Sequence, residues 1–213
     1  MIPQYVLSIL DKFKSTTVLG KALRIPLNLL PKNLIVTIPF GVNKGMRWIV
    51  GAGNHGFWTG TRDMEEQLAI TRLAKPGMVV FDIGAHCGFY TLAFSRLVGN
   101  QGKVFSFEPN PYNLVFLSRH LTMNHISNTV ILPLAVSKEK GLMFFDFGHN
   151  TAQGFLTHKK GIYLSPVVSL DKFVFDHLLP FPDLVKIDVE GNESNVLAGF
   201  LKTLELRKTC FYY

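Results

Sequence analysis

The stretch VVFDIGAHCGFYT, residues 79–91, constrains the fold of this chain more than any other. An apolar run typical of a buried strand contains an acid, Asp82, and Gly84, Ala85 and Gly88 follow before a helical pattern begins. Glycines between a parallel strand and a helix let a ligand approach the backbone at the carboxyl edge of the sheet. The stretch therefore predicts an α/β fold with a nucleotide-like ligand at this turn.

The acid in this stretch indicates which ligand. A dinucleotide-binding turn has the pattern G-x-G-x-x-G and holds a pyrophosphate at the helix N-terminus. This chain has G-A-x-x-G, and Asp82 would repel a phosphate. S-adenosylmethionine, which carries a sulfonium and an amino group but no phosphate, fits better. Glu108 ends the next predicted strand, where a carboxylate can accept hydrogen bonds from both ribose hydroxyls.

Apolar runs alternate with helical patterns after Val79, which predicts a mostly parallel, doubly wound sheet with helices on both faces. The expected strands are 79–83, 103–108, 130–136 and 184–189, and the expected helices are 88–98 and two that start at Asn110 and Asn192. From 137 to 183 the alternation lapses, and 142–147 and 166–171 are expected to form strands of an inserted hairpin or a sheet extension, joined by a polar loop. The final CFYY is expected to begin a further strand.

Residues 1–60 are expected to form an N-terminal helical and β-hairpin extension, before a main domain of residues 61–213. The stretch 5–13 has apolar residues at helical spacing beside lysines. Such a helix within residues 1–33 is compatible with peripheral membrane contact, although packing on its own domain is the interpretation we favour. Residues 33–50 predict two short strands around a turn, and residues 51–60 predict a glycine-rich loop.

Composition limits the class of protein. The 213 residues are 47% hydrophobic and 17% charged, as in a globular domain with a substantial core. The net charge is +7, but no basic run exceeds Lys159–Lys160, which favours a solvated surface over nucleic-acid binding. Two cysteines make no disulfide framework or metal-ligand spacing. With no signal peptide or long apolar span in the pattern, a cytoplasmic protein is expected. Asp188, Glu190 and Glu193 could hold Mg²⁺, but no metal is expected, because such sites need several convergent oxygens that the sequence does not place.

Several stretches together resemble the FkbM family of S-adenosylmethionine-dependent methyltransferases. They are PGMVVFDIGAHCGFYTLAFSR, VFSFEPNPYNLVFLSRHLTMN, ILPLAVS, VVSLDKF and LVKIDVEGNESNVLAGF, and they extend from about Gly60 to Phe200. The resemblance implies a Rossmann-like class I methyltransferase fold, with S-adenosyl-L-methionine as cofactor. It also implies transfer of a methyl group to a hydroxyl acceptor, such as a sugar or another small metabolite.

The resemblance assigns cofactor contacts residue by residue. The D-x-G-A-x-x-G loop, with Asp82, Gly84, Ala85 and Gly88, would bind the methionine end of the cofactor. In F-E-P-N, Glu108 followed by Pro109 would face the ribose, and the segment around Ala135 would lie by the adenine. His86 stands where the family more often has Asn, and it is a cofactor contact, a base or, as we favour, a tolerated replacement.

The strand LVKIDV carries charges where a central parallel strand is normally apolar. Lys186 and Asp188 share a face, and Glu190 follows with the same parity if the strand continues. An ion pair at the strand end would explain them, because burying charges is costly unless they are paired. The alternative, which we favour, is catalysis: Asp188 or Glu190 accepts the hydroxyl proton and Lys186 orients the base.

Other candidates are weaker. The acids Asp63, Glu65 and Glu66 either close over the cofactor or form a solvated helix face. Weak candidates for substrate contacts, with core packing favoured for the two aromatic residues, are Phe57, Trp58 and the loop around Gln153 and Gly154.

The sequence departs from the family near its end. The family's sheet continues into a fifth strand and an antiparallel pair, so we expect a sheet incomplete at its C-terminal edge and open to self-association. A shortened, non-catalytic relative that binds a cofactor, a partner or a membrane surface is the first alternative. A nicotinamide-dependent oxidoreductase is the second, less favoured because of Asp82.

Overall fold

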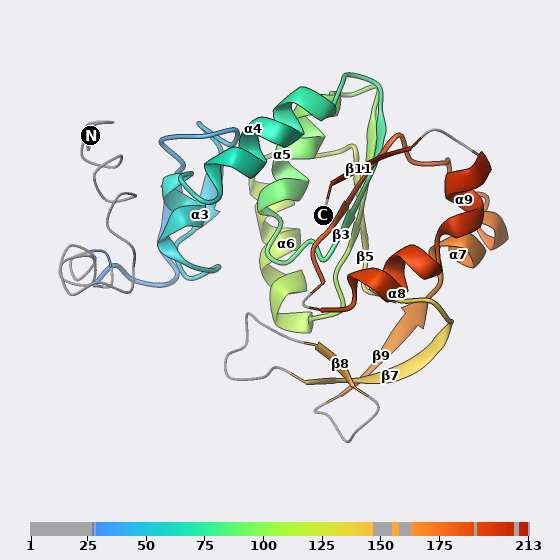
Figure 1. Ribbon diagram of the computed structural model, residues 1–213. Coiled ribbons are helices and arrows are strands. Elements are labelled where there is room, and N and C mark those ends of the chain that lie inside the picture. The colour runs from blue at the N-terminus through green and yellow to red at the C-terminus, as the bar shows by residue number, and fades with distance from the viewer. Residues whose placement is uncertain are drawn as a thin grey trace. The chain divides into compact units, whose positions relative to one another are not determined.

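The computed structural model describes residues 27, 29–146, 155–157, 163–189, 191–206 and 209–212 (Figure 1). The chain divides into two compact units, Met1–Gln67 and Leu68–Tyr213. The division at residue 60 expected from the sequence stays a prediction. The expected amphipathic helix 5–13 lies outside the described residues, as do Gln153, Gly154 and Glu190. In the described part of the chain, no helix is long and apolar enough to span a membrane.

The second unit is built on a five-stranded sheet in which every neighbouring pair of strands is parallel. Its order is β11 (Cys210–Tyr212), β10 (Leu184–Ile187), β3 (Val79–Ile83), β4 (Lys103–Phe107) and β5 (Thr129–Leu132). The strand order reverses beside β3, because β4 lies on one side of it and β10 on the other. The carboxyl ends of β3 and β10 therefore flank the crevice where such sheets bind ligands.

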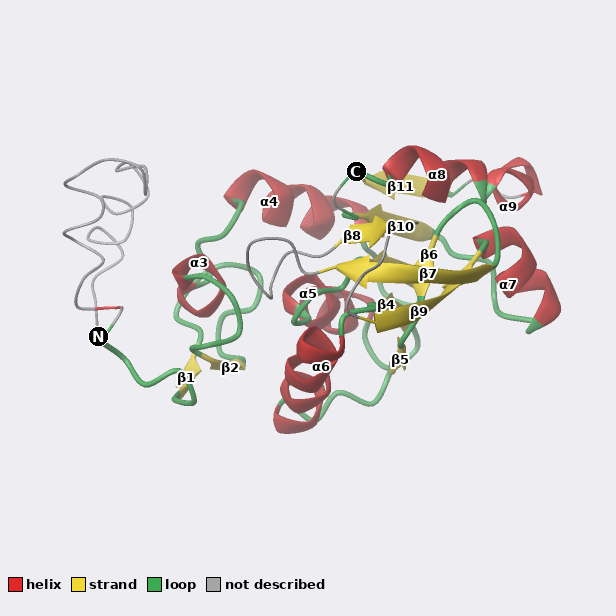
Figure 2. Cartoon of the chain, turned by 90° about the horizontal axis from the view of Figure 1, so that it is seen from below, coloured by secondary structure: helices red, strands yellow, loops and turns green. Residues whose placement is uncertain are grey.

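Helices cover both faces of this sheet, which confirms the predicted doubly wound fold. On one face lie α5 (Phe89–Val98) and α6 (Pro111–Met123), and on the other α7 (Leu170–Asp176), α8 (Glu193–Ala198) and α9 (Leu201–Leu206) (Figures 1 and 2). Asn110 caps α6 as predicted, since its side-chain oxygen accepts a hydrogen bond from the Tyr112 N–H at 2.9 Å. Pro111 follows at the first helical position.

The inserted segment and the short strand before it together form a second sheet, of four strands. Its order is β6 (Ala135–Val136), β9 (Tyr163–Val168), β7 (Gly141–Asp146) and β8 (Phe155–Thr157). β7 and β9 pair antiparallel, as in a sheet extension rather than a simple hairpin, because β8 from the segment between them pairs with the other edge of β7. The strand predicted at 130–136 is wrong as a single element, because β5 ends at Leu132 and β6 joins the other sheet. Pro133 stands between them, and its missing N–H cannot continue the ladder.

Two helical predictions also need correction. The helix expected from Asn192 is two helices, α8 and α9, separated at Gly199. A Cβ at Gly199 would lie 2.4 Å from the carbonyl oxygen of Ser137, so the chain packs its backbone closely there. The strand predicted at 166–171 is too long at its end, because helix α7 begins at Leu170. The sequence pattern does not predict this helix.

The first unit contains the expected strand pair, β1 (Ile35–Thr37) and β2 (Arg47–Ile49), in antiparallel register. The predicted glycine-rich loop instead contains a short helix, α3 (His55–Thr59), because the Asn54 side chain caps it by accepting from the Gly56 N–H at 3.0 Å. Phe57 and Trp58 are buried, which confirms core packing for both.

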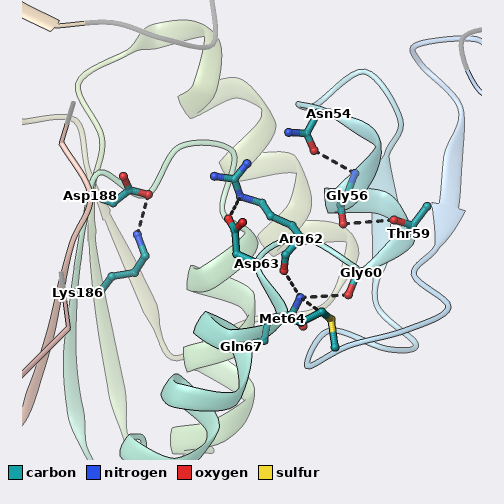
Figure 3. A network of polar contacts seen from close by, with 10 residues as sticks. All are labelled: Asn54, Gly56, Thr59, Gly60, Arg62, Asp63, Met64, Gln67, Lys186 and Asp188. Carbon is teal, nitrogen blue, oxygen red and sulfur yellow. Dashed lines mark hydrogen bonds and ion pairs between the residues drawn. The ribbon is translucent and has the colours of Figure 1, made fainter. Parts of the chain in front are cut away.

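Gln67 ties the first unit together. Its Oε1 accepts from the Val42 N–H at 2.8 Å, and its Nε2 donates to the carbonyl oxygens of Gly60, at 3.1 Å, and Arg62 (Figure 3). Helix α4 (Met64–Leu73) carries Gln67 and begins with the acidic stretch of the sequence. Arg62 pairs with Asp63 through a 3.0 Å contact.

Alternation along the parallel strands separates an aromatic core from a polar row. Phe81 in β3 lies on the face covered by α7, α8 and α9, where its ring centroid is 6.5 Å from that of Phe200. Successive side chains of a strand point to opposite faces. The neighbouring residue Asp82, together with its register partners Lys186 in β10 and Ser106 in β4, therefore belongs to the face covered by α5.

Truncation of Phe200 should unfold the second unit more easily. Phe200 is fully buried, so Phe200→Ala should lower the free energy of unfolding by about 3–5 kcal/mol through lost burial and the cavity that remains. Leu201→Ala is the matched control, because that neighbour is 55% exposed and should cost less than about 1 kcal/mol. Urea unfolding of both variants measures the difference, and equal losses would contradict this packing.

Candidate functional site

The glycine turn after β3 is shaped by contacts within the chain. The N–H groups of Gly84 and Ala85 both donate to the carbonyl oxygen of Phe107, at 2.9 and 3.0 Å. Gly84 has φ +80°, and a Cβ on it would lie 1.9 Å from the carbonyl oxygen of Asp188. Gly88, with φ +91°, caps α5, and a Cβ there would lie 2.5 Å from Leu117 Cδ1. Packing alone therefore accounts for both glycines.

Asp82 is the most unusual group of the site. Its side chain is fully buried at the carboxyl end of β3, and its Oδ2 accepts a 2.6 Å hydrogen bond from Thr91 Oγ1 on α5. Its Oδ1 is buried without a hydrogen-bond partner in the described part of the chain. Burial raises the pKa of Asp82, although Lys186 and the Thr91 hydroxyl lower it. One carboxylate oxygen is thus satisfied, and the other is left for a donor that the described residues do not supply.

Lys186 and Asp188 form the ion pair that the sequence suggested at the strand end. Lys186 is buried, and its Nζ donates to Asp188 Oδ2 at 3.2 Å (Figure 3). The same Nζ lies 4.8 Å from the centre of the Tyr90 ring on α5. The Asp188 side chain is 54% exposed, which leaves it accessible to a substrate. The catalytic role of the pair stays a prediction.

Glu108 organises the other side of the turn. Its Oε2 accepts from the His86 N–H at 2.7 Å, and its Oε1 accepts from the Asn110 N–H at 2.8 Å and from Asn113 Nδ2 at 3.2 Å. Burial raises the pKa of Glu108 to about 7, while these hydrogen bonds lower it. Among the described residues Oε2 accepts from the His86 N–H alone, so it retains the capacity to accept another hydrogen bond.

The remaining predicted residues lie around these groups. Pro109 follows Glu108, and its carbonyl oxygen accepts a hydrogen bond from the Tyr163 hydroxyl of β9. Ala135 is buried in β6, which pairs with β9. His86 adopts φ +51°, a left-handed conformation uncommon for a residue with a side chain. Cys87 is buried and packs as predicted.

Sequence reasoning missed four residues: Tyr90, Thr91, Asn113 and Tyr163. Tyr90 and Thr91 occupy the first turn of the helix that follows the glycine turn. Polar residues at that place can be recognised in a sequence as candidates for contact with charged groups of the sheet. Asn113 reaches Glu108 from the first turn of α6, as a partner five residues along the chain. Tyr163 gave no local signal, because it comes from the inserted hairpin.

The described part of the chain holds no cluster of three or more histidine, cysteine or acidic side chains arranged to bind a metal ion. What the described residues bring together is a buried carboxylate, a buried ammonium and an accessible carboxylate at the ends of β3 and β10. A second buried carboxylate lies at the end of β4. This arrangement suits a ligand that carries positive charge and hydroxyl groups.

Comparison with known proteins gives a family match and a curated relative. The methyltransferase FkbM domain matches residues 82–211. The hexuronic acid methyltransferase AglP of Haloferax volcanii is 31% identical over 152 residues, which are 68% of this chain. The chain spans 60% of the length of that relative.

Similar solved structures are more distant. The methyltransferase FkbM of Methylobacillus flagellatus KT aligns at 16% identity with a TM-score of 0.47, over 75% of this chain and 44% of its own. The precorrin-6y C5,15-methyltransferase of Geobacter metallireducens GS-15 aligns at 20% identity with a TM-score of 0.41, over 66% of this chain and 57% of its own.

The raised pKa of Glu108 predicts a pH dependence of stability. Between the ordinary Glu pKa of 4.5 and about 7, the unfolded chain loses a proton that the folded chain keeps. The free energy of unfolding should therefore fall as pH rises through this window, by about 2–3 kcal/mol from this group, and stay level above it. Urea unfolding from pH 4.5 to 8 should show this slope in the wild type and not in Glu108→Gln. Asp82 contributes a slope of the same sign to both proteins, so a slope unchanged in the variant would contradict the assignment.

Proposed function

The chain belongs to the FkbM family of methyltransferases, and on that premise we propose that it transfers the methyl group of S-adenosylmethionine to a hydroxyl oxygen of a sugar or related small metabolite. The observation that carries the proposal is the buried Oδ1 of Asp82, which has no partner in the described part of the chain. A buried carboxylate oxygen without a donor is costly, and a ligand ammonium satisfies it with a charge-assisted hydrogen bond.

The chain's own residues would hold the cofactor from three directions. Asp82 receives the amino group through Oδ1, and Glu108 receives a ribose hydroxyl through Oε2, to which the His86 N–H is the one donor among the residues that the structure describes. The turn from Gly84 to Gly88, with Ala85 and His86 between them, lines the methionine end. By the family resemblance, Pro109 would lie with Glu108 at the ribose, and Ala135 would lie by the adenine. The family match supports this set of contacts.

The bound cofactor supplies an electrophilic methyl group on a positively charged sulfur, which is a good leaving group. The protein then has two tasks: to hold the acceptor oxygen in line and to take its proton. Asp188 suits the second task, because its carboxylate is accessible and Lys186 Nζ, at 3.2 Å, orients it. Asp188 Oδ1 would take the hydroxyl proton as the acceptor oxygen displaces the cofactor sulfur from the methyl carbon, which leaves the sulfur as a neutral thioether. Glu190 is the second candidate for this role.

The acceptor is proposed from the relative and from charge. The relative is named a hexuronic acid methyltransferase, which supports a sugar acceptor that carries a carboxylate. The net charge of +7 attracts acidic molecules over neutral ones. A hexuronic acid hydroxyl is therefore the acceptor to test first, with the corresponding neutral hexose beside it.

Calorimetric titration with S-adenosylmethionine tests the cofactor. Wild-type protein should show one saturable site, and Asp82→Ala should bind at least about tenfold more weakly because the ligand ammonium loses its partner. Asp176→Ala is the matched control, since this acid is exposed at the end of α7 and should bind as the wild type does. Equal affinity of Asp82→Ala and wild type would remove Asp82 from the site.

A parallel titration followed by NADH fluorescence addresses the oxidoreductase alternative. Saturable NADH binding without S-adenosylmethionine binding would overturn the proposed function. Neither binding, in a chain shown to be folded, would favour a non-catalytic relative.

Transfer of a radiolabelled methyl group to hexuronic acid and hexose acceptors tests the base. Asp188→Asn should lower kcat by about 10²–10⁴-fold while the affinity for S-adenosylmethionine changes little. Glu139→Gln, an exposed acid on the same unit, should keep wild-type kcat. Retained activity in Asp188→Asn together with lost activity in Glu190→Gln would move the base to Glu190.

A further inference from the structure

Two buried side chains of opposite charge lie on neighbouring strands, on the same face of the sheet, without a hydrogen bond between them. Asp82 and Lys186 are register partners in β3 and β10, and both are at most 1% exposed. In a low-dielectric interior such a pair attracts strongly. Yet the hydrogen bond of Lys186 Nζ goes to Asp188, and Asp82 Oδ1 keeps no partner in the described part of the chain. Besides the ion pair with Asp188, a second contact also engages this ammonium.

This second contact is with the ring of Tyr90. Lys186 Nζ lies 4.8 Å from the ring centre, within the range of a cation–π interaction. Tyr90 is buried in the first turn of α5, beside Thr91, whose hydroxyl occupies the other oxygen of Asp82. The first turn of α5 thus donates a hydrogen bond to Asp82 Oδ2. The same turn also contacts the Lys186 ammonium, which could otherwise donate to Asp82 Oδ1.

We infer that Tyr90 is a positioning residue, which holds the Lys186 ammonium toward Asp188 and so keeps Asp82 Oδ1 available for the amino group of the cofactor. The inference rests on the proposed function, because it takes S-adenosylmethionine as the ligand of Asp82. Without the ring, the Lys186 side chain reaches Asp82 from the next strand and competes with the ligand ammonium. An ammonium within the chain competes at high effective concentration, so the cofactor then binds more weakly.

A double-mutant cycle separates this role from simple packing. Tyr90→Leu should weaken S-adenosylmethionine binding by about tenfold in calorimetry, the size expected for a desolvated cation–π contact. Tyr90→Phe keeps the ring and should bind within about twofold of the wild type. In a Lys186→Met background, Tyr90→Leu should change the affinity by less than about twofold, because the competing ammonium is gone. The same loss in both backgrounds would reduce Tyr90 to a packing residue and overturn the inference.

Crystal structures of the ligand-free variants give a readout that does not depend on the cofactor. In Tyr90→Leu, Lys186 Nζ should lie within hydrogen-bond distance of Asp82 Oδ1, and in Tyr90→Phe it should stay on Asp188. Lys186 held on Asp188 in Tyr90→Leu would overturn the inference. Tyr90→Met serves in the same experiments if the leucine variant does not fold. Absence of S-adenosylmethionine binding by the wild type would instead overturn the proposed function. The structures of the variants would still decide whether Tyr90 positions Lys186.

Discussion

The burial of opposite charges in the two central strands is the constraint on which the rest of the site depends. Asp82 and Lys186 lie on the sheet face covered by α5, where an unpaired charge is costly. Helix α5 supplies contacts to both charges: the Thr91 hydroxyl donates to one oxygen of Asp82, and the Tyr90 ring lies against the Lys186 ammonium. These contacts hold the helix over the strand ends. Because the glycine turn leads directly into this helix, the same buried charges also set the position of the turn.

The carboxyl ends of three strands are joined by backbone contacts as well as by charge. The Gly84 turn touches the carbonyl of Asp188 so closely that a side chain at Gly84 would not fit. The next residues of the turn are held by β4 and its continuation, through the Phe107 carbonyl and the Glu108 carboxylate. The proposed cofactor side and the proposed base therefore share one rigid backbone frame, which suits a reaction that depends on alignment.

The sequence predicted the parallel strands and the acids at their ends, because both follow from short-range patterns. An apolar run with an acid at or near its end, as at Asp82 and Glu108, predicts a strand whose carboxyl end holds that acid. Parallel strands bring such ends to one edge of the sheet. Prediction failed where a distant contact decides the outcome. The close approach at Gly199 separates α8 from α9, and Pro133 diverts the chain into a second sheet. The roles of Tyr90 and Tyr163 depend on partners about 50 residues or more away, which no local pattern reveals.

The inserted sheet is attached to the parallel sheet at both of its flanks. Tyr163 at the start of β9 donates to the Pro109 carbonyl, and the Asn192 side chain donates to the carbonyl of Val136 in β6 at 3.1 Å. These two hydrogen bonds join the inserted sheet to the segments that follow β4 and β10, where the proposed ribose contact and the proposed base also lie. A displacement of the inserted sheet would therefore strain both segments together, so that disturbance of one is felt at the other.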